Sequence, residues 1–465
     1  MKHKKYNRSK SLACRCSEIV EQVMTAVGRE RRPADRVLRA LFRERRELGS
    51  RDRRLIRETL YSVFRWWGWL YPLAPLSGRE AMNRQDENAE FPESETGHRR
   101  HGDADLKVWS PLLLAAQYME WTTQPPTAEV FARFAVRKPE KVLASLTFAG
   151  TPAERMEELR PVLFPEAPPA GQWSYRDLVP EWCLNLIDCP VPTEELIRWL
   201  QSRPPLWVRV QSSLPESVLD ELRNTGFRVE RSSASPCAAA LFDSTANVYQ
   251  LPAYQRGEME VQDLASQFIG ELCGATPGQR WWDACAGGGG KTLLLADHMQ
   301  GRGKVVASDI RSYKLKDLRR RAKRGKFCNI ETKSWDGKRV DTRKANFDGV
   351  LVDAPCSGSG TWRRNPDARW AAAPEEVNEL AEKQLEILSN ASRAVQPGGV
   401  LVYATCSMFN HENKNVVDVF LEQEEDFYLD PFTHPLTGDR MEGYIQVWPW
   451  EGDSDAMFIA RMRRK

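Results

Sequence analysis

The sequence predicts an α/β protein with a doubly wound parallel sheet, preceded by an all-α domain and a small α+β module. Apolar residues recur at helical spacing through residues 16–75, the pattern of amphipathic helices. Helical and strand patterns mix over residues 173–251. After Tyr254, short apolar runs alternate with helical patterns, which is typical of a parallel sheet covered by helices. A chain of 465 residues is long enough for two or three domains.

The first predicted domain comprises residues 1–165. Within it, residues 78–107 are polar and poor in aliphatic side chains, which predicts a mobile loop. Helical spacing resumes over residues 111–159, and a Pro-rich linker at 161–169 closes the domain.

The second predicted domain, residues 170–253, is the α+β module, with a strand at 206–210 between two helical patterns. The third, residues 254–465, carries the doubly wound sheet. Its candidate strands are residues 280–283, 304–308, 347–352, 400–403 and 456–461.

Clusters of cationic side chains indicate RNA as a partner. The net charge is only +3, but residues 29–57 hold twelve Arg against five acidic residues. Residues 311–326 hold nine Lys or Arg against one acid, and residues 461–465 add a basic end. Clustered cations can follow a phosphate backbone, and some of the sixteen Trp could stack on bases. Any one cluster taken alone is better explained as a solvated helix face, and it is the three clusters together that favour RNA.

The composition argues against membrane, secreted and metal-dependent classes. No run of 18 apolar residues occurs, and the basic N-terminus lacks the apolar core of a signal peptide. The ten Cys include no Cys-x-x-Cys pair and only six His are present, so neither a disulfide framework nor a zinc site is indicated. We therefore expect a cytoplasmic monomer with reduced thiols, no metal and no membrane association.

Two cysteines stand out because each follows an apolar run that is typical of a buried strand. Cys356 lies in the segment DAPCSGSG and Cys406 in the segment ATCS. Open α/β folds bind ligands at the carboxyl ends of their parallel strands. Two thiols that meet there indicate covalent chemistry with a second proton-handling group. Either cysteine alone could be a small buried hydrophobe, but their shared placement favours a functional role.

A glycine-rich loop, DACAGGGGKT at residues 283–292, follows one candidate strand and opens a helix. Glycines let such a backbone turn tightly and approach a ligand closely. A phosphate-binding P-loop would need Gly where Cys285 stands, and the dinucleotide-binding fingerprint is only loosely matched. A nucleoside-binding loop fits better, because Asp309 ends the next strand, where a carboxylate can accept hydrogen bonds from ribose hydroxyls. An Asp in this place can also be a simple helix N-cap.

Taken together, residues 254–465 resemble the RsmB/Sun family of S-adenosylmethionine-dependent RNA (cytosine-5) methyltransferases. The matching blocks, in order, are GEMEVQD at 257–263, the loop at 283–291, Asp309, Asp336, DAPCSGSG at 353–360, RNPD at 364–367, and PGG at 397–399 leading to TCS at 405–407. Residues 30–70 are similar to the NusB-like helical domain that bacterial RsmB carries. The family's loop usually reads CAAPGGK, whereas residues 285–291 read CAGGGGK, and losing the Pro is expected to loosen the loop.

The resemblance implies a Rossmann-like methyltransferase fold and S-adenosyl-L-methionine as the cofactor. Cys406 would attack carbon 6 of cytosine, and Cys356 would help release the product by aiding proton loss from carbon 5. Asp353 would hydrogen-bond the base near N3. The residues implied at the cofactor are Cys285, Ala286, Gly287, Gly288, Gly289, Gly290, Lys291, Asp309 at the ribose hydroxyls, Asp336 near the adenine, and Asp353. Arg364 and Asp367 could contact RNA or pin their loop.

The implied substrate is an RNA whose cytosine is flipped out or single-stranded, so that it can reach a buried thiol. By resemblance, 16S ribosomal RNA is expected and transfer RNA is the alternative. A DNA cytosine methyltransferase would lack the Thr-Cys-Ser cysteine. A non-catalytic ribosome assembly factor would not need both cysteines and the acids. The N-terminal helices and the α+β module would hold the surrounding RNA.

Overall fold

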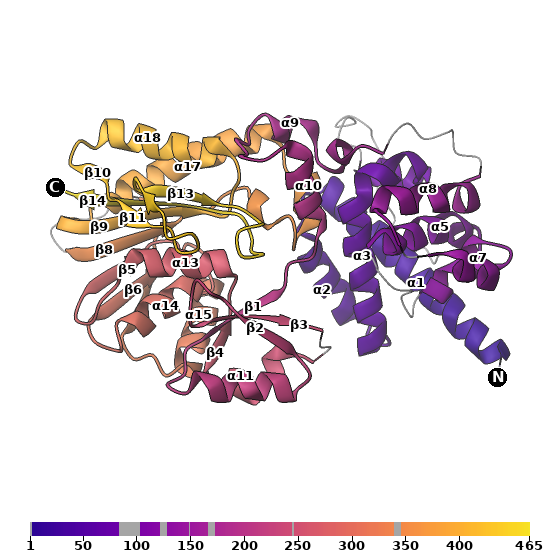
Figure 1. Cartoon of the computed structure of the whole chain (residues 1–465), viewed down its shortest axis with the longest axis horizontal. Coiled ribbons are helices and arrows are strands. Elements are labelled where there is room, and N and C mark those ends of the chain that lie inside the picture. Colours follow the sequence, from indigo (N-terminus) through magenta and orange to yellow (C-terminus); the bar gives the residue numbers. More distant parts are fainter. Residues whose placement is uncertain are drawn as a thin grey trace. The chain divides into compact units, whose positions relative to one another are not determined.

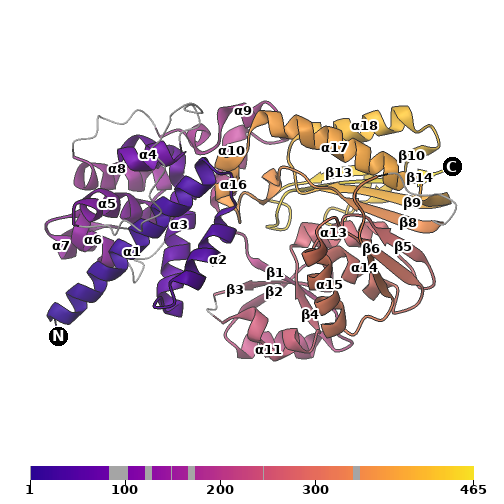
Figure 2. The same cartoon turned by 180° about the vertical axis from the view of Figure 1, so that it is seen from behind.

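The chain forms two compact units (Figure 1, Figure 2). The computed structural model describes residues 2–82, 103–120, 128–147, 149–165, 173–243, 246–338 and 346–465. One unit comprises Met1–Leu184, Val191–Gln201 and Asn365–Ala372, and the other comprises Asn185–Pro190, Ser202–Arg364 and Ala373–Lys465. Neither unit is one continuous stretch, so the division differs from the three successive domains that the sequence predicts.

The first unit is helical in its described residues. Its helices are α1 (Lys2–Gly28), α2 (Ala34–Glu44), α3 (Ser50–Leu70), α4 (Leu76–Met82), α5 (Asp103–Glu120), α6 (Ala128–Ala135), α7 (Pro139–Ser145), α8 (Pro152–Leu163), α9 (Glu181–Leu184), α10 (Thr193–Gln201) and α16 (Pro366–Ala371). The amphipathic spacing buries one face of each long helix: Ile19, Val23 and Val27 of α1, for example, have no exposed surface.

Two predictions for this unit are corrected. The predicted polar loop at 78–107 begins inside α4 and ends inside α5, and its centre, residues 83–102, lies outside the described residues. The predicted linker at 161–169 begins too early, because α8 runs through Pro161 to Leu163. Burial of Leu159 and Leu163 there outweighs the low helix propensity of proline. Residues 166–172 lie outside the described residues.

A four-stranded antiparallel sheet begins the second unit, with strand order β2-β3-β1-β4. Its elements are β1 (Leu206–Val210), α11 (Pro215–Asn224), β2 (Arg228–Arg231), β3 (Ala238–Phe242), α12 (Pro252–Gln255) and β4 (Met259–Val261). This is a ferredoxin-like β-α-β-β-α-β arrangement. Its last strand lies beyond the predicted boundary at residue 253, and the sheet belongs to the same compact unit as the larger sheet.

The larger sheet has the order β10-β14-β9-β8-β5-β6-β7, with β13 paired to β14. Its strands are β5 (Arg280–Asp283), β6 (Lys304–Ser308), β7 (Ile330–Lys333), β8 (Phe347–Asp353), β9 (Val395–Thr405), β10 (Phe427–Leu429), β13 (Tyr444–Val447) and β14 (Met457–Arg464); β11 (Phe432–Thr433) pairs with β12 (Arg440–Met441). Strands β5 to β9 are parallel, and β14 is antiparallel to β9. The predicted doubly wound sheet is confirmed, and its order reverses between β5 and β8, where such sheets bind ligands.

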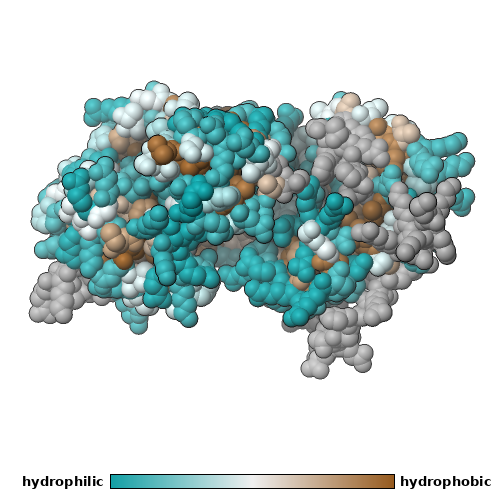
Figure 3. Space-filling view, turned by 90° about the horizontal axis from the view of Figure 1, so that it is seen from below, coloured by the Kyte–Doolittle hydropathy of each residue, from teal (hydrophilic) through white to brown (hydrophobic). Residues whose placement is uncertain are grey.

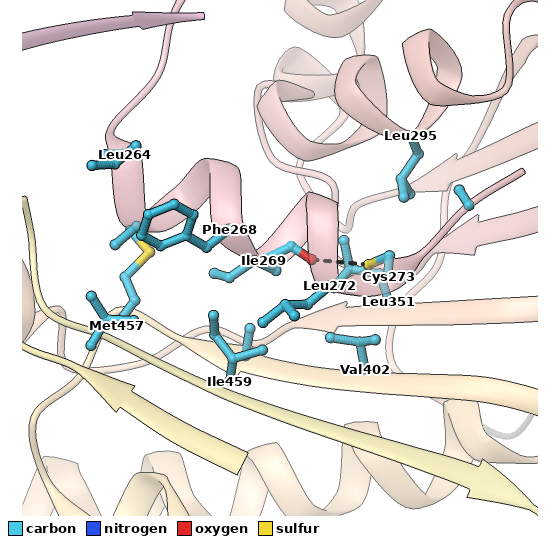
Figure 4. Close-up of a cluster of buried hydrophobic side chains, with 14 of the residues drawn as sticks. Leu264, Phe268, Ile269, Leu272, Cys273, Leu295, Leu351, Val402, Met457 and Ile459 are labelled. Carbon is cyan, nitrogen blue, oxygen red and sulfur yellow. Dashed lines mark hydrogen bonds between the residues drawn. The ribbon is translucent and has the colours of Figure 1, made fainter. Parts of the chain in front are cut away.

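Helices cover both faces of this sheet (Figure 1). On one face lie α13 (Leu264–Cys273), α14 (Gly290–His298) and α15 (Ser312–Arg324), and on the other lie α17 (Pro374–Ser392) and α18 (Lys414–Gln423). Figure 4 shows the core under α13, where Phe268 and Ile269 pack against Met457 and Ile459 of β14.

The same core buries one face of the small sheet. Trp207, Ala238 and Ala240 point into it and are at most 6% exposed. In RNA-binding domains with this type of four-stranded sheet, aromatic residues on the open face stack on bases. In this chain that face is covered by α13, so the RNA contact predicted for the module cannot use it.

Candidate active site

The two cysteines meet at the carboxyl ends of adjacent strands. Strand β8 ends at Asp353, which lies opposite Ala404 of the parallel strand β9. Cys356 follows β8 by three residues and Cys406 follows β9 directly, and their Sγ atoms lie 3.3 Å apart. The parallel pairing of β8 and β9 therefore brings the two thiols into contact.

A buried glutamate ties the two cysteine loops together. Glu412 has no exposed surface. Its carboxylate accepts hydrogen bonds from Ser357 N (2.8 Å), Ser357 Oγ (2.5 Å) and Ser407 Oγ (2.5 Å). Ser357 follows Cys356 and Ser407 follows Cys406, so one carboxylate fixes the positions of both loops. Sequence reasoning missed Glu412, although an acid six residues after Cys406 in the post-strand segment was a visible signal.

Local interactions keep Cys356 protonated. Its contact with Cys406 raises the pKa of the Cys356 thiol well above its ordinary value, and burial and the charge of Glu412 act in the same direction. Tyr403 of β9 donates to the backbone oxygen of Glu412 (2.5 Å), and burial raises the pKa of this phenol. A neutral thiol beside a second cysteine is suited to proton transfer.

A lysine places a positive charge beside the thiols. Lys291 Nζ, in the first turn of α14, lies 2.8 Å from Asp353 Oδ2. Burial alone would lower the pKa of Lys291, but Asp353, with a smaller contribution from Cys406, outweighs burial and raises it. The ammonium group therefore stays charged. Asp353 Oδ1 has no partner among the described residues, which leaves one carboxylate oxygen for a ligand.

The glycine loop connects β5 to α14. Gly287 and Gly289 have φ values of +51° and +86°, in the left-handed region that glycine adopts at little cost. A Cβ on Gly289 would lie 2.5 Å from Leu318 Cγ, so α15 packs directly on the loop. Burial raises the pKa of Cys285, which makes this thiol unreactive.

A buried carboxylate with an unpaired oxygen stands at the start of the loop. Asp283 is 1% exposed and ends β5. Its Oδ2 accepts from Thr292 Oγ1 (2.6 Å), whereas Oδ1 has no partner among the described residues. Burial raises the pKa of Asp283 to about 7. An unpaired buried carboxylate is costly, and this one suits a cationic group of a ligand. Sequence reasoning gave Asp283 no role.

Asp309 directly follows β6 and is 4% exposed. It accepts hydrogen bonds from Gly287 N (2.9 Å) and from N, Nε and Nη2 of Arg311 (2.8, 3.0 and 3.0 Å). Four bonds fill the acceptor sites of a carboxylate. Ribose hydroxyls could therefore bind Asp309 only if the Arg311 side chain moves away.

Asp336 forms no hydrogen bond or ion pair with the other candidates among the described residues. It is exposed in the irregular segment after β7, where its carboxylate accepts from Lys338 N (3.1 Å), and this bond lowers its pKa. Within the described ranges, no contact joins Asp336 to the glycine loop or to Asp309.

Arg364 and Asp367 have structural partners, which favours the pinning role over RNA contact. Arg364 donates to Asp263 (2.6 Å) and Asp455 (2.9 Å). Asp367 accepts from Ala34 N (2.9 Å), at the start of α2, and so acts as a helix cap from a distant part of the sequence.

The predicted basic clusters divide into internal and outward-facing cations. Arg321 and Arg324 of α15 pair with Glu260, which is 1% exposed. The exposed cations of this segment that form no ion pair with described residues are Lys316, Arg319, Lys323 and Lys326. Within residues 29–57, the exposed cations that form no ion pair with described residues are Arg36, Arg43, Arg46, Arg51 and Arg57.

The surface drawn in Figure 3 is mostly hydrophilic, with hydrophobic side chains scattered among polar ones. Over the described part of the chain, every helix is too short or too polar to cross a membrane. The same residues contain no group of three or more His, Cys, Asp or Glu that could hold a metal ion.

A family model and several known proteins that match this chain indicate the same family. A family model described as 16S rRNA methyltransferase RsmB/F matches residues 273–463. The ribosomal RNA small subunit methyltransferase B of Cronobacter sakazakii is 33% identical over 296 residues, which cover 62% of this chain and 67% of that protein. Its namesake in Pasteurella multocida is 32% identical, covering 62% and 66%, and the probable namesake in Bacillus subtilis is 32% identical, covering 53% and 57%. The chain thus spans between about half and two thirds of the length of these relatives.

Solved structures show the same fold. The crystal structure of PH0851 has a TM-score of 0.70 at 24% identity and covers 96% of this chain and 99% of that chain. The structure of NSun6 from Pyrococcus horikoshii with SFG has a TM-score of 0.53 at 18% identity, covering 63% and 98%. At these identities the likeness concerns the fold alone, and it agrees with the predicted Rossmann-like sheet.

Proposed function

The chain belongs to the 16S rRNA methyltransferase RsmB/F family, and from that premise we propose that it methylates carbon 5 of a cytosine in 16S ribosomal RNA, using S-adenosyl-L-methionine. One observation carries the proposal: Cys356 and Cys406 lie with their Sγ atoms 3.3 Å apart, at strand ends that also carry Asp353 and its partner Lys291. Two thiols, a carboxylate and an ammonium group at this edge of the sheet suit covalent catalysis on a base.

The residues around the glycine loop fit the methyl donor. S-adenosyl-L-methionine would supply an electrophilic methyl group on a sulfonium. Asp283 Oδ1, a buried oxygen without a partner among the described residues, suits its cationic groups. Gly287 and Gly289 let the backbone approach closely, and Asp309 is the proposed acceptor for ribose hydroxyls. The proposed place of Asp336 near the adenine rests on the resemblance alone.

The side chains suggest a division of roles. Cytosine carbon 5 is a poor nucleophile until a thiolate adds at carbon 6. We assign that addition to Cys406, which first loses its thiol proton to solvent, so that an Sγ electron pair forms the bond to carbon 6. The carbon 5–carbon 6 π electrons shift toward N3, which takes up a proton and donates it in a hydrogen bond to Asp353 Oδ1, and carbon 5 becomes enamine-like. After methylation, loss of the carbon 5 proton and departure of Cys406 restore the aromatic ring.

Cys356 is placed to take the carbon 5 proton. The largest cause of its raised pKa is the contact with Cys406. Bonding of Cys406 Sγ to carbon 6 removes this contribution, whereas burial and the charge of Glu412 continue to raise the pKa of Cys356. We assign removal of the carbon 5 proton to Cys356 because its Sγ lies 3.3 Å from the sulfur that bonds to the base.

The substrate assignment follows from the site and the surface charges. Both cysteines are present, which favours RNA over DNA as the substrate, and the intact site argues against a non-catalytic assembly factor. The exposed cations of α2, α3 and α15 support binding to phosphates. Transfer RNA remains the alternative substrate.

Bisulfite sequencing of total RNA from a deletion strain tests the proposal. At least one 16S cytosine that is protected in the parent strain should become convertible, and the wild-type gene, but not a Cys406→Ala gene, should restore protection. A change confined to transfer RNA would assign the alternative substrate. An unchanged methylation pattern would favour the alternative that the chain is a non-catalytic ribosome assembly factor.

A further inference from the structure

We propose that Arg321, held by the buried Glu260, is a positioning residue for the cofactor loop and replaces the proline that this loop lacks. The inference rests on the proposed use of residues 285–291 for S-adenosyl-L-methionine. It concerns a departure of this chain from its family, because Gly288 stands where the family's loop usually has Pro. Four consecutive glycines would by themselves leave the loop with many conformations.

The contact between Arg321 and the loop is direct. Arg321 Nη1 donates to the backbone oxygen of Gly288 at 2.6 Å. A Cβ on residue 288 would lie 3.3 Å from the same Nη1 atom, which is tighter than an ordinary contact. A proline ring at 288 and the Arg321 side chain therefore compete for the same space. Either the proline ring or the Arg321 side chain can restrict the backbone of the loop, and each does so best when the other is absent.

Arg321 is itself immobilised. Glu260 of β4 is 1% exposed, and its Oε2 accepts from Nε (3.2 Å) and Nη2 (3.0 Å) of Arg321. Arg324 pairs with the other carboxylate oxygen and lies 3.8 Å from the centre of the Tyr254 ring. A buried carboxylate is costly to leave unpaired. The bonds from Nε and Nη2 to Glu260 therefore hold the guanidinium of Arg321 in the orientation in which Nη1 contacts the loop.

The position of α15 explains why this helix can support the loop. It lies beside α14 and β4 (Figure 2). Leu318, one turn before Arg321, packs on Gly289, where a Cβ would lie 2.5 Å from its Cγ. Two successive loop residues, Gly288 and Gly289, are thus held by successive turns of one helix. Within the basic segment 311–326, Arg321 therefore supports the cofactor loop, whereas the exposed cations of the segment face solvent.

A double-mutant cycle on the full chain tests the proposal, with S-adenosyl-L-methionine binding measured by calorimetry. Arg321→Ala should weaken binding about tenfold, the scale of one hydrogen bond from a charged group. Gly288→Pro alone should also weaken binding, because the ring displaces Arg321. The double variant should recover to within about threefold of the wild type, a non-additivity expected only of residues that share one space.

Arg324→Ala is the matched control, because Arg324 shares the helix and Glu260 but does not touch the loop. Thermal unfolding should show similar destabilisation of Arg324→Ala and Arg321→Ala, yet Arg324→Ala should keep its affinity within about twofold and gain nothing from Gly288→Pro. If Arg321→Ala fails to fold, Arg321→Lys serves, since it keeps the charge beside Glu260 but loses the planar fork that reaches Gly288.

Additive losses in the double variant, or equal losses for Arg321→Ala and Arg324→Ala, would overturn the positioning role. A wild-type chain that does not bind S-adenosyl-L-methionine would instead overturn the proposed function, so the two failures are distinguishable.

Discussion

Ser357 and Glu412 are joined by two hydrogen bonds, in which the backbone N and the Oγ of Ser357 each donate to one carboxylate oxygen, at 2.8 and 2.5 Å. The hydroxyl of Ser407 donates to the same carboxylate. The loops that carry Cys356 and Cys406 therefore share one buried anchor. Glu412 bonds to the serines beside the two cysteines and not to the thiols themselves.

Glu412→Gln should lower kcat and leave cofactor binding unchanged. The amide nitrogen cannot accept a hydrogen bond, so one serine donor loses its partner, at a cost of about 1–3 kcal/mol. We expect kcat to fall at least about tenfold, whereas the affinity for S-adenosyl-L-methionine should stay, because Glu412 does not contact residues 285–291. Methyl-transfer kinetics and calorimetry measure the two quantities. Glu422→Gln, on the exposed side of α18, is the control, and equal losses of kcat and affinity would contradict this role.

Arg311→Ala should strengthen cofactor binding, because it frees the Asp309 carboxylate for ribose hydroxyls. A partly exposed ion pair is worth about 0–1 kcal/mol, so the gain should be at most about fivefold. Asp309→Ala should weaken binding at least about tenfold, through loss of hydrogen bonds to a charged acceptor. Calorimetric titration of S-adenosyl-L-methionine into Arg311→Ala and Asp309→Ala measures both affinities. Weaker binding by Arg311→Ala would show that Arg311 orients Asp309 instead of competing for it.

Asp283 should make both stability and cofactor binding depend on pH. Burial raises its pKa from 3.8 to about 7 in the folded chain. Because the folded-state pKa lies above the unfolded one, its stabilising contribution is complete below about pH 4 and is lost as the pH rises through about 7. Asp283→Asn should therefore gain thermal stability relative to wild type at about pH 8 and not at about pH 4.

A cationic ligand group should bind the ionised form of Asp283 and release a proton near pH 6. Calorimetry in two buffers of different ionisation enthalpy counts that proton, and Asp283→Asn should not release it. The same stability difference at both pH values would contradict the assignment.

RNA binding should depend on salt through the exposed cations. With roughly six phosphate contacts, affinity should fall about a thousandfold between 50 and 200 mM salt. Replacing Arg319 and Lys323 with Ala should reduce the slope of log affinity against log salt by about 1.8. Lys383→Ala on α17, a cation paired with Glu386, should leave the slope unchanged. A flat salt response of the wild type would mean that the clusters at 29–57 and 311–326 are ordinary solvated faces.

The central strands could be predicted because their apolar runs stand alone between turn residues. Strands β5 and β6 begin and end where the sequence predicts. Strand β7, with the sequence IETK, was missed because it is short, polar and at the sheet edge. Strand β4 has three residues and forms through pairing with β1, about fifty residues earlier in the chain. A pairing over that distance leaves no local signal, so the boundary at residue 253 was misplaced.

The thiol pair could be predicted because parallel strands end at one edge of a sheet. Arg321 could not, since nothing in a run of cations marks the one that turns inward. Glu412, an acid six residues after Cys406, had a visible signal that the prediction did not use. The sequence could not decide whether Arg364 contacts RNA or pins its loop, because one of its partners, Asp263, is about a hundred residues away in the sequence.

In the proposed mechanism, Cys406 bonds to cytosine and Cys356 releases the product. The most direct measurement is the covalent protein–RNA adduct on a denaturing gel, in the presence of S-adenosyl-L-methionine, for the wild type, Cys356→Ser and Cys406→Ser. Cys356→Ser should accumulate adduct, because Cys406 still attacks while a hydroxyl, far less ionised than a thiol near neutral pH, removes the carbon 5 proton poorly. Cys406→Ser should form no adduct and transfer no methyl group. Adduct in Cys406→Ser and none in Cys356→Ser would exchange the roles, and full methyl transfer by both variants would contradict the mechanism.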